Sequence, residues 1–366
     1  LALRDAIFGS AHRREVRRQN MRNCMGFKGY QRYGIAKDKW DAFNFEEGGG
    51  REKEERRQRT DDNPKALAYE RFRLLAYPTS PLRYPVIGHM DSLQAMQLPA
   101  LKDWYQRWYS PANAVLVIVG DVDPVAARQA VDTYFAGLSG PQPPVRVDTD
   151  EFMHLGERNL NLFLPVKVPL LYLGYNVPTL GSKNAPAEDV YALALLQSIL
   201  DGGLSARLEQ RLVREQRLLT AVSTSYEPLA RGGGLWMLSA IPENGHTLLE
   251  ARRALLAEIE RLKTGAIDAR EIQRALINLR AELAFAQDSL AEQAQMLGEL
   301  ATAGLDPKLL DDYPQKLAAV TPEQLARVAQ RYLTQDNLST LYLAPQDSPL
   351  NPDRPAPSTP VTEGQP

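Results

Sequence analysis

The stretch "LLTAVSTSYEPLARGGGLWMLSAIP", residues 218–242, decides the kind of fold that this chain adopts. It contains two strand-like runs, 218–228 and 233–242, which are joined through "LARGGG" at 229–234. Two such runs separated by a short glycine-rich segment predict a β-hairpin. We therefore expect at least one antiparallel pair of strands in the second half of the chain.

Helical patterns flank this hairpin on both sides. Apolar residues recur every three or four positions in 187–200, 204–216, 247–263 and 268–303, which is typical of helices that bury one face. In the second of these segments, Leu204, Leu208 and Leu212 share a face. Further strand-like runs lie within 159–178 and at 338–345. Strands and helices mixed in this way predict an α+β fold, with an antiparallel-rich sheet and helices on one face of it.

The first half of the chain contains a less complete version of the same pattern. Residues 66–77 and 97–109 have helical spacing, and each segment is followed by a proline. The β-branched run Val115–Val119 predicts a buried strand, and the next helix is expected to begin with Asp123 as its cap and Pro124 at the first helical position. The proline-rich segment 140–150 is the predicted linker to a second domain.

Composition limits the possible functions. The formal charge of −2 and the pI near 6.2 give no global attraction to nucleic acid or anionic membrane. Between Arg13 and Arg32 the chain carries seven basic residues and one acid, Glu15, which suits a solvated helix face or a nucleic-acid contact; we expect the former and no nucleic-acid partner. The single cysteine excludes an intrachain disulfide. No apolar stretch is long enough to span a membrane, and we expect no signal peptide in the first residues given, because their apolar part is too short.

Several segments together resemble the insulinase/pitrilysin family of zinc metallopeptidases, in its bacterial and mitochondrial-processing-type branch. They are "EERRQRTDDNPKALAYERF" at 54–72, "LKDWYQRWYSPANAVLVIVGDVDP" at 101–124, "SILDGGLSARLEQRLVREQRLLTAVSTSYEP" at 198–228, and the helix "REIQRALINLRAELAFAQDSLAEQAQMLGELATAG" at 270–304. The resemblance extends over residues 54–345. It implies two related metallopeptidase-type domains, each with a sheet and helices on one face.

The zinc motif of this family is H-x-x-E-H on a helix, in which the histidines bind zinc and the glutamate activates the bound water. In many members "FKG" follows the motif closely, and here "FKG" is 27–29. This register puts Asn20 and Cys24 at the histidine positions and Asn23 at the general-base position. An amide does not accept a proton near neutral pH, so general-base catalysis is lost. "HRREV" offers His12 and Glu15 in H-x-x-E spacing as an alternative, but Val16 replaces the second histidine.

The resemblance also implies a distal glutamate ligand, which matches Glu55, with Glu54 as the adjacent alternative. Cys24 and Glu55 leave the metal one protein ligand short, because asparagine is a weak ligand for zinc. We therefore expect zinc to bind weakly or not at all. The interval from Cys24 to Glu55 is much shorter than in the family, which suggests that strand and helix material is missing and that the first domain is incomplete.

On this basis we divide the chain into four parts. Residues 1–62 are a degenerate or shortened start of the first domain, 63–143 are its remainder, and 144–345 are the second, C-terminal domain of the inactive type. Residues 346–366, with six prolines, are a disordered tail.

The second domain of active family members contributes an arginine and a tyrosine that stabilise the oxyanion. Arg214 matches the arginine, although an exposed helix arginine paired with a nearby acid explains it equally well. The tyrosine position is Thr220, and Tyr226 lies further along the same strand. Arg214 and Tyr226 are the candidate substrate-binding residues.

Two functions follow from the resemblance. The first is a non-catalytic homologue that binds peptide or unfolded polypeptide and forms a chamber wall with a second insulinase-family subunit, or as a homodimer. The alternative is an active zinc-dependent metalloendopeptidase. The resemblance points to the bacterial periplasm or cell envelope, although the chain shows no signal peptide.

Overall fold

The computed structural model describes residues 53–145 and 155–348 of the 366-residue chain. These residues form two compact units. The first unit contains 53–63, 84–145 and 287–298, and the second contains 64–83, 155–286 and 299–348. Because the second unit combines a sheet with many helices, the predicted α+β fold class is confirmed.

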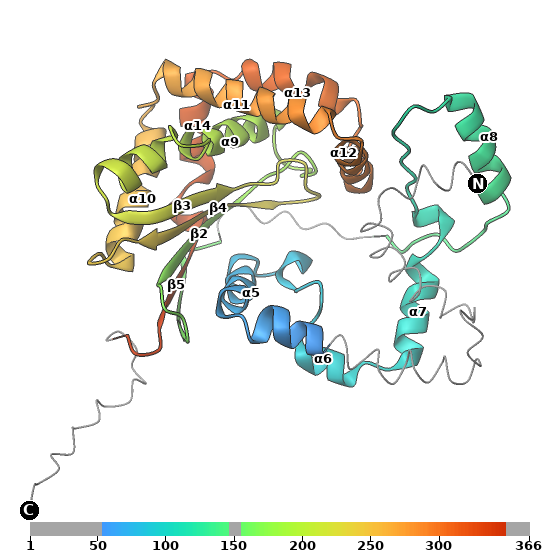
Figure 1. Ribbon diagram of the computed structural model, residues 1–366, viewed down its shortest axis with the longest axis horizontal. Coiled ribbons are helices and arrows are strands. Elements are labelled where there is room, and N and C mark those ends of the chain that lie inside the picture. The colour runs from blue at the N-terminus through green and yellow to red at the C-terminus, as the bar shows by residue number, and fades with distance from the viewer. Residues whose placement is uncertain (1–52, 146–154, 349–366) are drawn as a thin grey trace, which may run out of the picture. The chain divides into compact units, whose positions relative to one another are not determined.

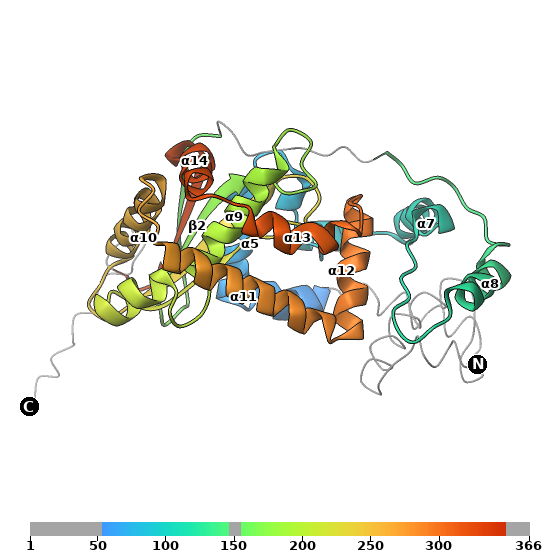
Figure 2. The ribbon, with the colours of Figure 1, turned by 90° about the horizontal axis from the view of Figure 1, so that it is seen from above.

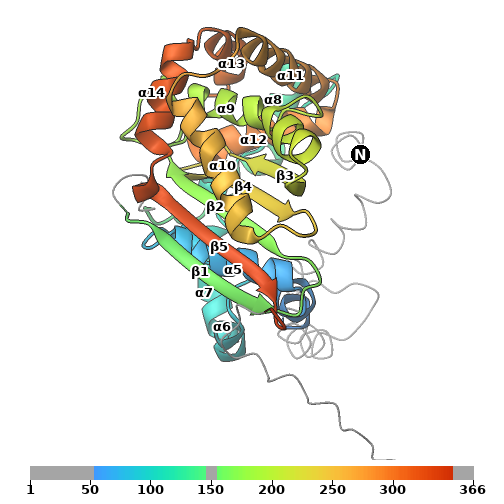
Figure 3. The ribbon, with the colours of Figure 1, turned by 90° about the vertical axis from the view of Figure 1, so that its left-hand side faces the viewer.

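A five-stranded sheet forms the centre of the second unit (Figure 3). Its strands are β1 (Arg158–Leu164), β2 (Leu170–Val177), β3 (Leu219–Ser225), β4 (Gly234–Pro242) and β5 (Leu338–Pro345). They are arranged in the order β1-β5-β2-β4-β3, and β1 and β5 are parallel while all other neighbours are antiparallel. The hairpin predicted from residues 218–242 is the β3–β4 pair.

Strand β2 shows that both faces of this sheet are covered. Successive side chains of a strand point to opposite faces. Leu171, Leu173 and Tyr175 belong to the main hydrophobic core, whereas Leu170 belongs to a second cluster and Tyr172 packs against that cluster. The nearly continuous apolar sequence of β2 is thus explained by burial on both sides.

Helices form a thick layer on the first face (Figures 1 and 2). They are α9 (Ala187–Leu200), α10 (Leu248–Lys263), α11 (Ala269–Gln287), α13 (Leu309–Ala318) and α14 (Pro322–Tyr332), and all contribute buried residues to the main core. Trp236 of β4 is fully buried, and its indole Nε1 donates to the Leu193 carbonyl of α9 at 3.2 Å. On α9, the ring of Tyr191 meets that of Tyr313 edge to face at 5.4 Å. Helix and sheet are therefore joined by specific contacts as well as by apolar burial.

Helix α5 (Pro64–Ala76) covers the opposite face of the sheet (Figure 1). Its Phe72 is fully buried and its ring centroid lies 5.6 Å from that of Tyr172. Gly174 makes room for Phe72, because a Cβ at that position would lie 2.8 Å from the phenylalanine Cζ. The amide of Asn176 donates to the Ala76 carbonyl at 2.9 Å and so fixes the helix end. The sequence pattern predicted helices on one face only, so α5 on this second face is an addition to the predicted arrangement.

Two helices differ from those expected from the spacing. The segment 268–303 is divided into α11 and α12 (Leu290–Ala303), because the Ser289 hydroxyl accepts from the Glu292 N–H at 3.3 Å and starts a new helix. The segment 204–216 forms the π-helix η4 (Glu209–Glu215), with helical residues beginning at 207. Leu208 and Leu212 are buried, but Leu204 lies outside the helix and is 72% exposed, so its predicted place on the buried face is wrong.

The described residues of the first unit form helices and irregular segments and contain no strand. Their elements are η1 (Arg57–Asp61), α6 (Met90–Ala95), α7 (Leu98–Trp108), the short 3₁₀ helix η3 (Pro111–Asn113), α8 (Pro124–Phe135) and residues 290–298 of α12. The 3₁₀ helices η2 (Pro81–Arg83) and η5 (Gln335–Asn337) belong to the second unit. As predicted, Asp123 caps α8, since its Oδ1 accepts from the Val125 N–H at 2.9 Å. The buried strand predicted at Val115–Val119 is wrong for the part of the chain that the structure describes, because these residues form no ladder there and Val115 is 52% exposed.

The predicted disordered tail lies outside the described residues from position 349 onward. Residues 146–150 of the predicted linker also lie outside them. Among the residues that the structure does describe, no helix combines the length and apolar character needed to cross a membrane.

Candidate functional site

The predicted distal ligand Glu55 lies on a helical stretch that continues into η1. Its side chain is 45% exposed and pairs with Arg59 at 3.1 Å. The neighbouring Glu54 accepts from Arg57 at 2.7 Å and from Gln58 at 2.6 Å, and these hydrogen bonds lower the pKa of its carboxyl group. Both glutamates thus lie on the surface with basic or amide partners of their own helix.

The other predicted ligand positions, Asn20 and Cys24, and the general-base position Asn23 lie outside the described residues, as do His12 and Glu15. Within residues 53–145 and 155–348, no three histidine, cysteine, aspartate or glutamate side chains gather closely enough to hold a metal ion. Glu55 pairs with Arg59 through an exposed ion pair, and its role as a zinc ligand stays a prediction because the other proposed ligands lie outside the described residues. No reaction step through zinc can be built from the described donors.

Arg214 lies near the end of η4, directly before the chain enters β3. Its guanidinium Nε lies 3.2 Å from Glu209 Oε1, and its side chain is 47% exposed. This ion pair is the one that the sequence analysis gave as the alternative to a substrate-binding role for Arg214. An exposed ion pair of this kind is weak and easily exchanged, so the arginine remains accessible to a ligand.

Tyr226 follows β3, and its side chain is only 7% exposed. Its hydroxyl donates to the Pro178 carbonyl at 2.6 Å, and burial raises the pKa of the phenol well above its ordinary value. Thr220, at the family's tyrosine position, is exposed, and its hydroxyl lies 3.0 Å from Glu243 Oε2. Arg214 and Tyr226 are therefore held differently: the first is presented at the surface, whereas the second is part of the core.

An open cleft of about 280 Å³ lies on the face of the sheet that carries α5. Its lining residues come from α5, β2, β3 and β4, and they are Tyr69, Tyr172, Ser223, Thr224, Ser225, Met237 and Ser239. The hydroxyls of Ser223 and Ser239 lie 2.7 Å apart across the β3–β4 pair. The rings of Tyr69 and Tyr172 meet edge to face at 6.1 Å.

The chemistry of this cleft is uncharged. Burial raises the pKa of Tyr172, and the nearby Tyr69 adds to this effect, so the phenol keeps its proton and can donate a hydrogen bond. The serine hydroxyls both donate and accept. Hydroxyl groups beside aromatic rings suit a peptide backbone and an apolar side chain better than an ion.

Sequence reasoning did not identify this cleft. The alternation of Ser223 and Ser225 in β3 was a usable signal, because residues two apart lie on the same face of a strand. Tyr69 carried no signal of its own, since α5 is distant in sequence from the strands that it meets. Only the packing of α5 on the sheet brings these side chains together.

Comparisons with known proteins identify the family. The family model described as "Peptidase M16 inactive domain" matches residues 95–279, about half of the chain. The chain therefore belongs to the M16 family of peptidases, which confirms the predicted insulinase/pitrilysin membership.

The relatives of this chain include several proteins named as zinc proteases. "Zinc protease PqqE" of Helicobacter pylori is 28% identical over 300 residues, which are 80% of this chain and 65% of the relative. An "Uncharacterized zinc protease" of Rickettsia felis is 26% identical over 241 residues, 65% of this chain and 55% of that protein. The chain thus spans less than two thirds of the length of either relative.

Solved structures share the fold of this chain. A protease from Helicobacter pylori superposes with a TM-score of 0.74 at 26% identity, covering 81% of this chain and 71% of that one. A peptidase M16 inactive domain from Pseudomonas fluorescens gives a TM-score of 0.69 at 20% identity, with 82% and 70% covered, and shows the fold alone. The first half of the periplasmic protease PqqL from Escherichia coli superposes with a TM-score of 0.64 at 19% identity. The match covers 81% of this chain and 64% of that one, and it again shows the fold alone.

Proposed function

We propose that this chain is a non-catalytic M16 family member that holds peptide or unfolded polypeptide for a proteolytic partner subunit. The observation that carries the proposal is the replacement of H-x-x-E-H by Asn20, Asn23 and Cys24 in the register set by "FKG". An asparagine at the general-base position does not take a proton from water. The match to the inactive domain of the family supports the presence of the peptide-binding half of the fold, which active and inactive members share.

The second unit supplies the surface for polypeptide in this proposal. Arg214 is accessible at the entry to β3, and the uncharged cleft opens on one side of that strand. An extended polypeptide offers backbone amides to the hydroxyls and side chains to the aromatic rings. These contacts bind a polypeptide without cleaving it.

The partner in this proposal is a second M16 subunit or a second copy of the chain. The apolar run from Val115 to Val119, in which Val115 and Leu116 are exposed and which has no strand partner among the described residues, is the surface that we expect such a subunit to cover. We further propose the periplasm or cell envelope as the compartment, because the structural neighbours include the periplasmic PqqL.

The decisive experiment measures metal and cleavage on the same purified chain. We expect less than stoichiometric zinc by plasma mass spectrometry, no cleavage of a quenched fluorescent peptide library, and measurable binding of a reduced, carboxymethylated protein. Stoichiometric zinc together with chelator-sensitive cleavage would instead establish an active metallopeptidase, the activity that the names of the relatives indicate.

Two variants examine the parts of the proposal separately. Restoring the motif with Asn20→His, Asn23→Glu and Cys24→His should increase zinc binding if the register is correct, and alanine at the same three positions is the control.

Filling the cleft with Ser223→Trp should weaken polypeptide binding about tenfold. Arg253→Trp, an exposed change on α10 outside the cleft lining, should leave binding unchanged.

A further inference from the structure

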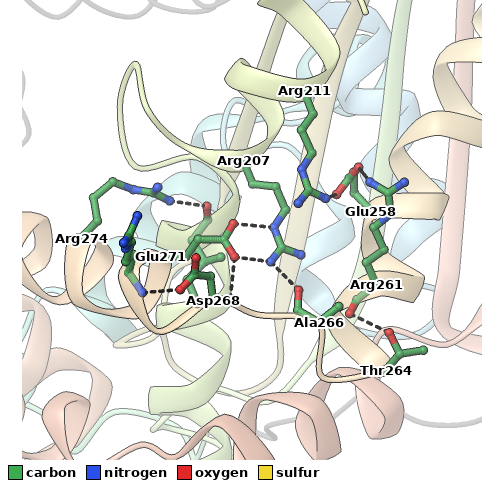
Figure 4. Close-up of polar contacts among 11 residues, drawn as sticks. Arg207, Arg211, Glu258, Arg261, Thr264, Ala266, Asp268, Glu271 and Arg274 are labelled. Atoms are coloured by element: carbon green, nitrogen blue, oxygen red, sulfur yellow. Dashed lines mark hydrogen bonds and ion pairs between the residues drawn. The ribbon is translucent and has the colours of Figure 1, made fainter. Parts of the chain in front are cut away.

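The helical stretch that carries Arg214 is anchored at its first turn by a buried ion pair. The side chain of Arg207 is fully buried. Its Nε donates to Glu271 Oε1 at 2.8 Å and its Nη2 donates to Glu271 Oε2 at 2.5 Å (Figure 4). The same Nη2 donates to the Ala266 carbonyl at 2.8 Å. This two-point geometry fixes the direction of the guanidinium as well as its position.

A second buried carboxylate anchors the next turn. Glu258 of α10 has a side chain that is 2% exposed, and its Oε2 accepts from Arg211 Nη1 at 2.9 Å. Its Oε1 accepts from Arg261 at 2.6 Å, so both oxygens are engaged (Figure 4). Removing one partner from such a group leaves a buried charge or donor without compensation. Arg211, whose own side chain is 34% exposed, is therefore tied to a buried carboxylate on α10.

The anchored turn is connected by backbone hydrogen bonds to the end of η4. The carbonyl of Arg211 accepts from the Gln216 N–H at 3.0 Å, and the carbonyl of Leu212 accepts from the Leu218 N–H at 2.9 Å. Arg214 lies between these two bonded positions. Any shift of Arg211 is thus passed to the turn that holds Arg214.

Arg214 itself is not anchored in this way. Its pairing with Glu209 is within the same helix and half exposed, whereas Arg207 and Arg211 reach across to α11 and α10. The helix therefore has a fixed beginning and an accessible end. Anchoring of this kind reduces the disorder that a ligand would otherwise have to remove on binding.

We propose that Glu258 and Glu271 are positioning residues that hold η4 so that Arg214 is presented to polypeptide. The identity of the ligand as a polypeptide rests on the proposed function. The positioning of η4 by the two carboxylates is independent of that function. Buried ion pairs seldom add net stability over apolar packing, and their attested use is to specify one arrangement among several. Here the arrangement that they specify is that of the turn between α9 and β3.

The first test measures amide hydrogen exchange by mass spectrometry in the full chain. Glu258→Gln should accelerate exchange in residues 209–219 by about tenfold, while peptides from β5 exchange as in the wild type. Glu260→Gln, an exposed acid of the same helix that pairs with Lys263, is the matched control and should change neither. Arg211→Gln, which leaves Glu258 paired with Arg261, should reproduce the effect if Glu258→Gln does not fold.

The second test measures binding of a reduced, carboxymethylated protein by fluorescence anisotropy. Glu258→Gln should weaken binding about tenfold in the wild type and have no further effect in an Arg214→Ala background, because both changes remove the same contact. If Glu258 had a merely structural role, Glu258→Gln would lower thermal stability in both backgrounds, and its effect on binding would be the same with and without Arg214.

Three results would overturn the inference. These are unchanged exchange of residues 209–219 in both Glu258→Gln and Arg211→Gln, wild-type binding by Arg214→Ala, or equal losses from Glu258→Gln in the two backgrounds. A wild-type chain that binds no unfolded polypeptide contradicts the proposed function instead, and the exchange measurement then decides alone whether the carboxylates hold η4.

Discussion

At the scale of single residues, Arg217 has the least usual backbone. Its φ of 49° lies in the left-handed region, where side chains other than glycine are disfavoured by about 1 kcal/mol. It connects η4 to β3, and the hydrogen bonds of Gln216 and Leu218 on either side hold the turn. The surrounding structure therefore imposes this conformation on an arginine.

We expect Arg217→Gly to raise the free energy of unfolding by about 1 kcal/mol, because glycine adopts this conformation without steric cost. Urea denaturation followed by tryptophan fluorescence measures the change. The matched control is Gln216→Gly, at φ −84° and ψ −22°, where glycine should lower stability by up to about 1 kcal/mol. A loss of stability in Arg217→Gly would show that its side chain makes contacts that outweigh the strain.

Gly174 offers a second prediction at this scale. An added Cβ would lie 2.8 Å from Phe72 Cζ and 3.2 Å from Leu235 Cδ1. Gly174→Ala should therefore lower the free energy of unfolding by about 1–3 kcal/mol through overpacking. Gly137→Ala, where the added carbon meets no atom within 4 Å, should be close to neutral. Combining Gly174→Ala with Phe72→Leu should recover part of the loss if the clash is the cause.

The predicted site residues show what a sequence can and cannot establish. The pairing of Arg214 with a nearby acid was foreseeable, because Glu209 is only one turn away. The burial of Tyr226 was not, since it depends on the Pro178 carbonyl, which is distant in the sequence. The roles assigned to Asn20, Asn23, Cys24 and Glu55 stay predictions.

At the scale of elements, the local sequence pattern was sufficient where the hydrogen-bonding partner of a strand is the next strand in the chain. The β3–β4 hairpin needs no third segment, and it forms as predicted. Val115–Val119 has an equally strong strand composition, but a strand exists only with a neighbour, and the described residues provide none. The packing of α5 on the sheet was invisible for the same reason, because it depends on strands distant in sequence.

The contact between η4 and α11 predicts a pH dependence. Burial alone would raise the pKa of Glu271, but the hydrogen bond from Arg207, the Asp268 N–H and the nearby arginine charges lower it overall. A carboxyl group whose pKa is lower in the folded state stabilises the fold fully above its unfolded pKa of about 4.3, and this contribution is lost as the pH falls through the folded value. Stability should therefore fall in acid.

Denaturant unfolding of the wild type and of Glu271→Gln at several pH values checks this expectation. The difference in free energy of unfolding between the two should be largest near pH 6 and should shrink as the pH is lowered below about 4. Glu260→Gln, which removes an exposed acid, should give a small difference at every pH. A gap between wild type and Glu271→Gln that widens in acid would contradict the assignment.

At the scale of the whole chain, the second unit is discontinuous in sequence. Residues 64–83, which include α5, precede the segment 84–145 of the first unit, whereas the sheet that α5 covers begins at Arg158. The predicted domain 63–143 therefore contains a helix that packs with the sheet of the later segment. A chain cut before β1 would lack the cover of one sheet face.

We expect Phe72→Asp in the full chain to detach α5 and to expose the apolar face formed by Leu170, Met237, Leu341 and Leu343. The buried charge and the lost packing should lower the free energy of unfolding by at least about 3 kcal/mol. Binding of an environment-sensitive dye and limited proteolysis near residues 78–83 report the detachment. Arg71→Asp, an exposed change on the same helix, is the control, and equal dye binding by both variants would argue against this role of Phe72.

The position of β5 in the sheet has a consequence for biosynthesis. β5 is the last of the described strands in the sequence, yet it lies between β1 and β2, so β1 has no neighbour and β2 pairs only with β4 until residue 345 has left the ribosome. A nascent chain that stalls earlier holds an unjoined edge strand and an exposed apolar layer, the state that chaperones and proteases recognise. Synthesis of β5, rather than the formation of the early hairpin, therefore commits this protein to its native sheet.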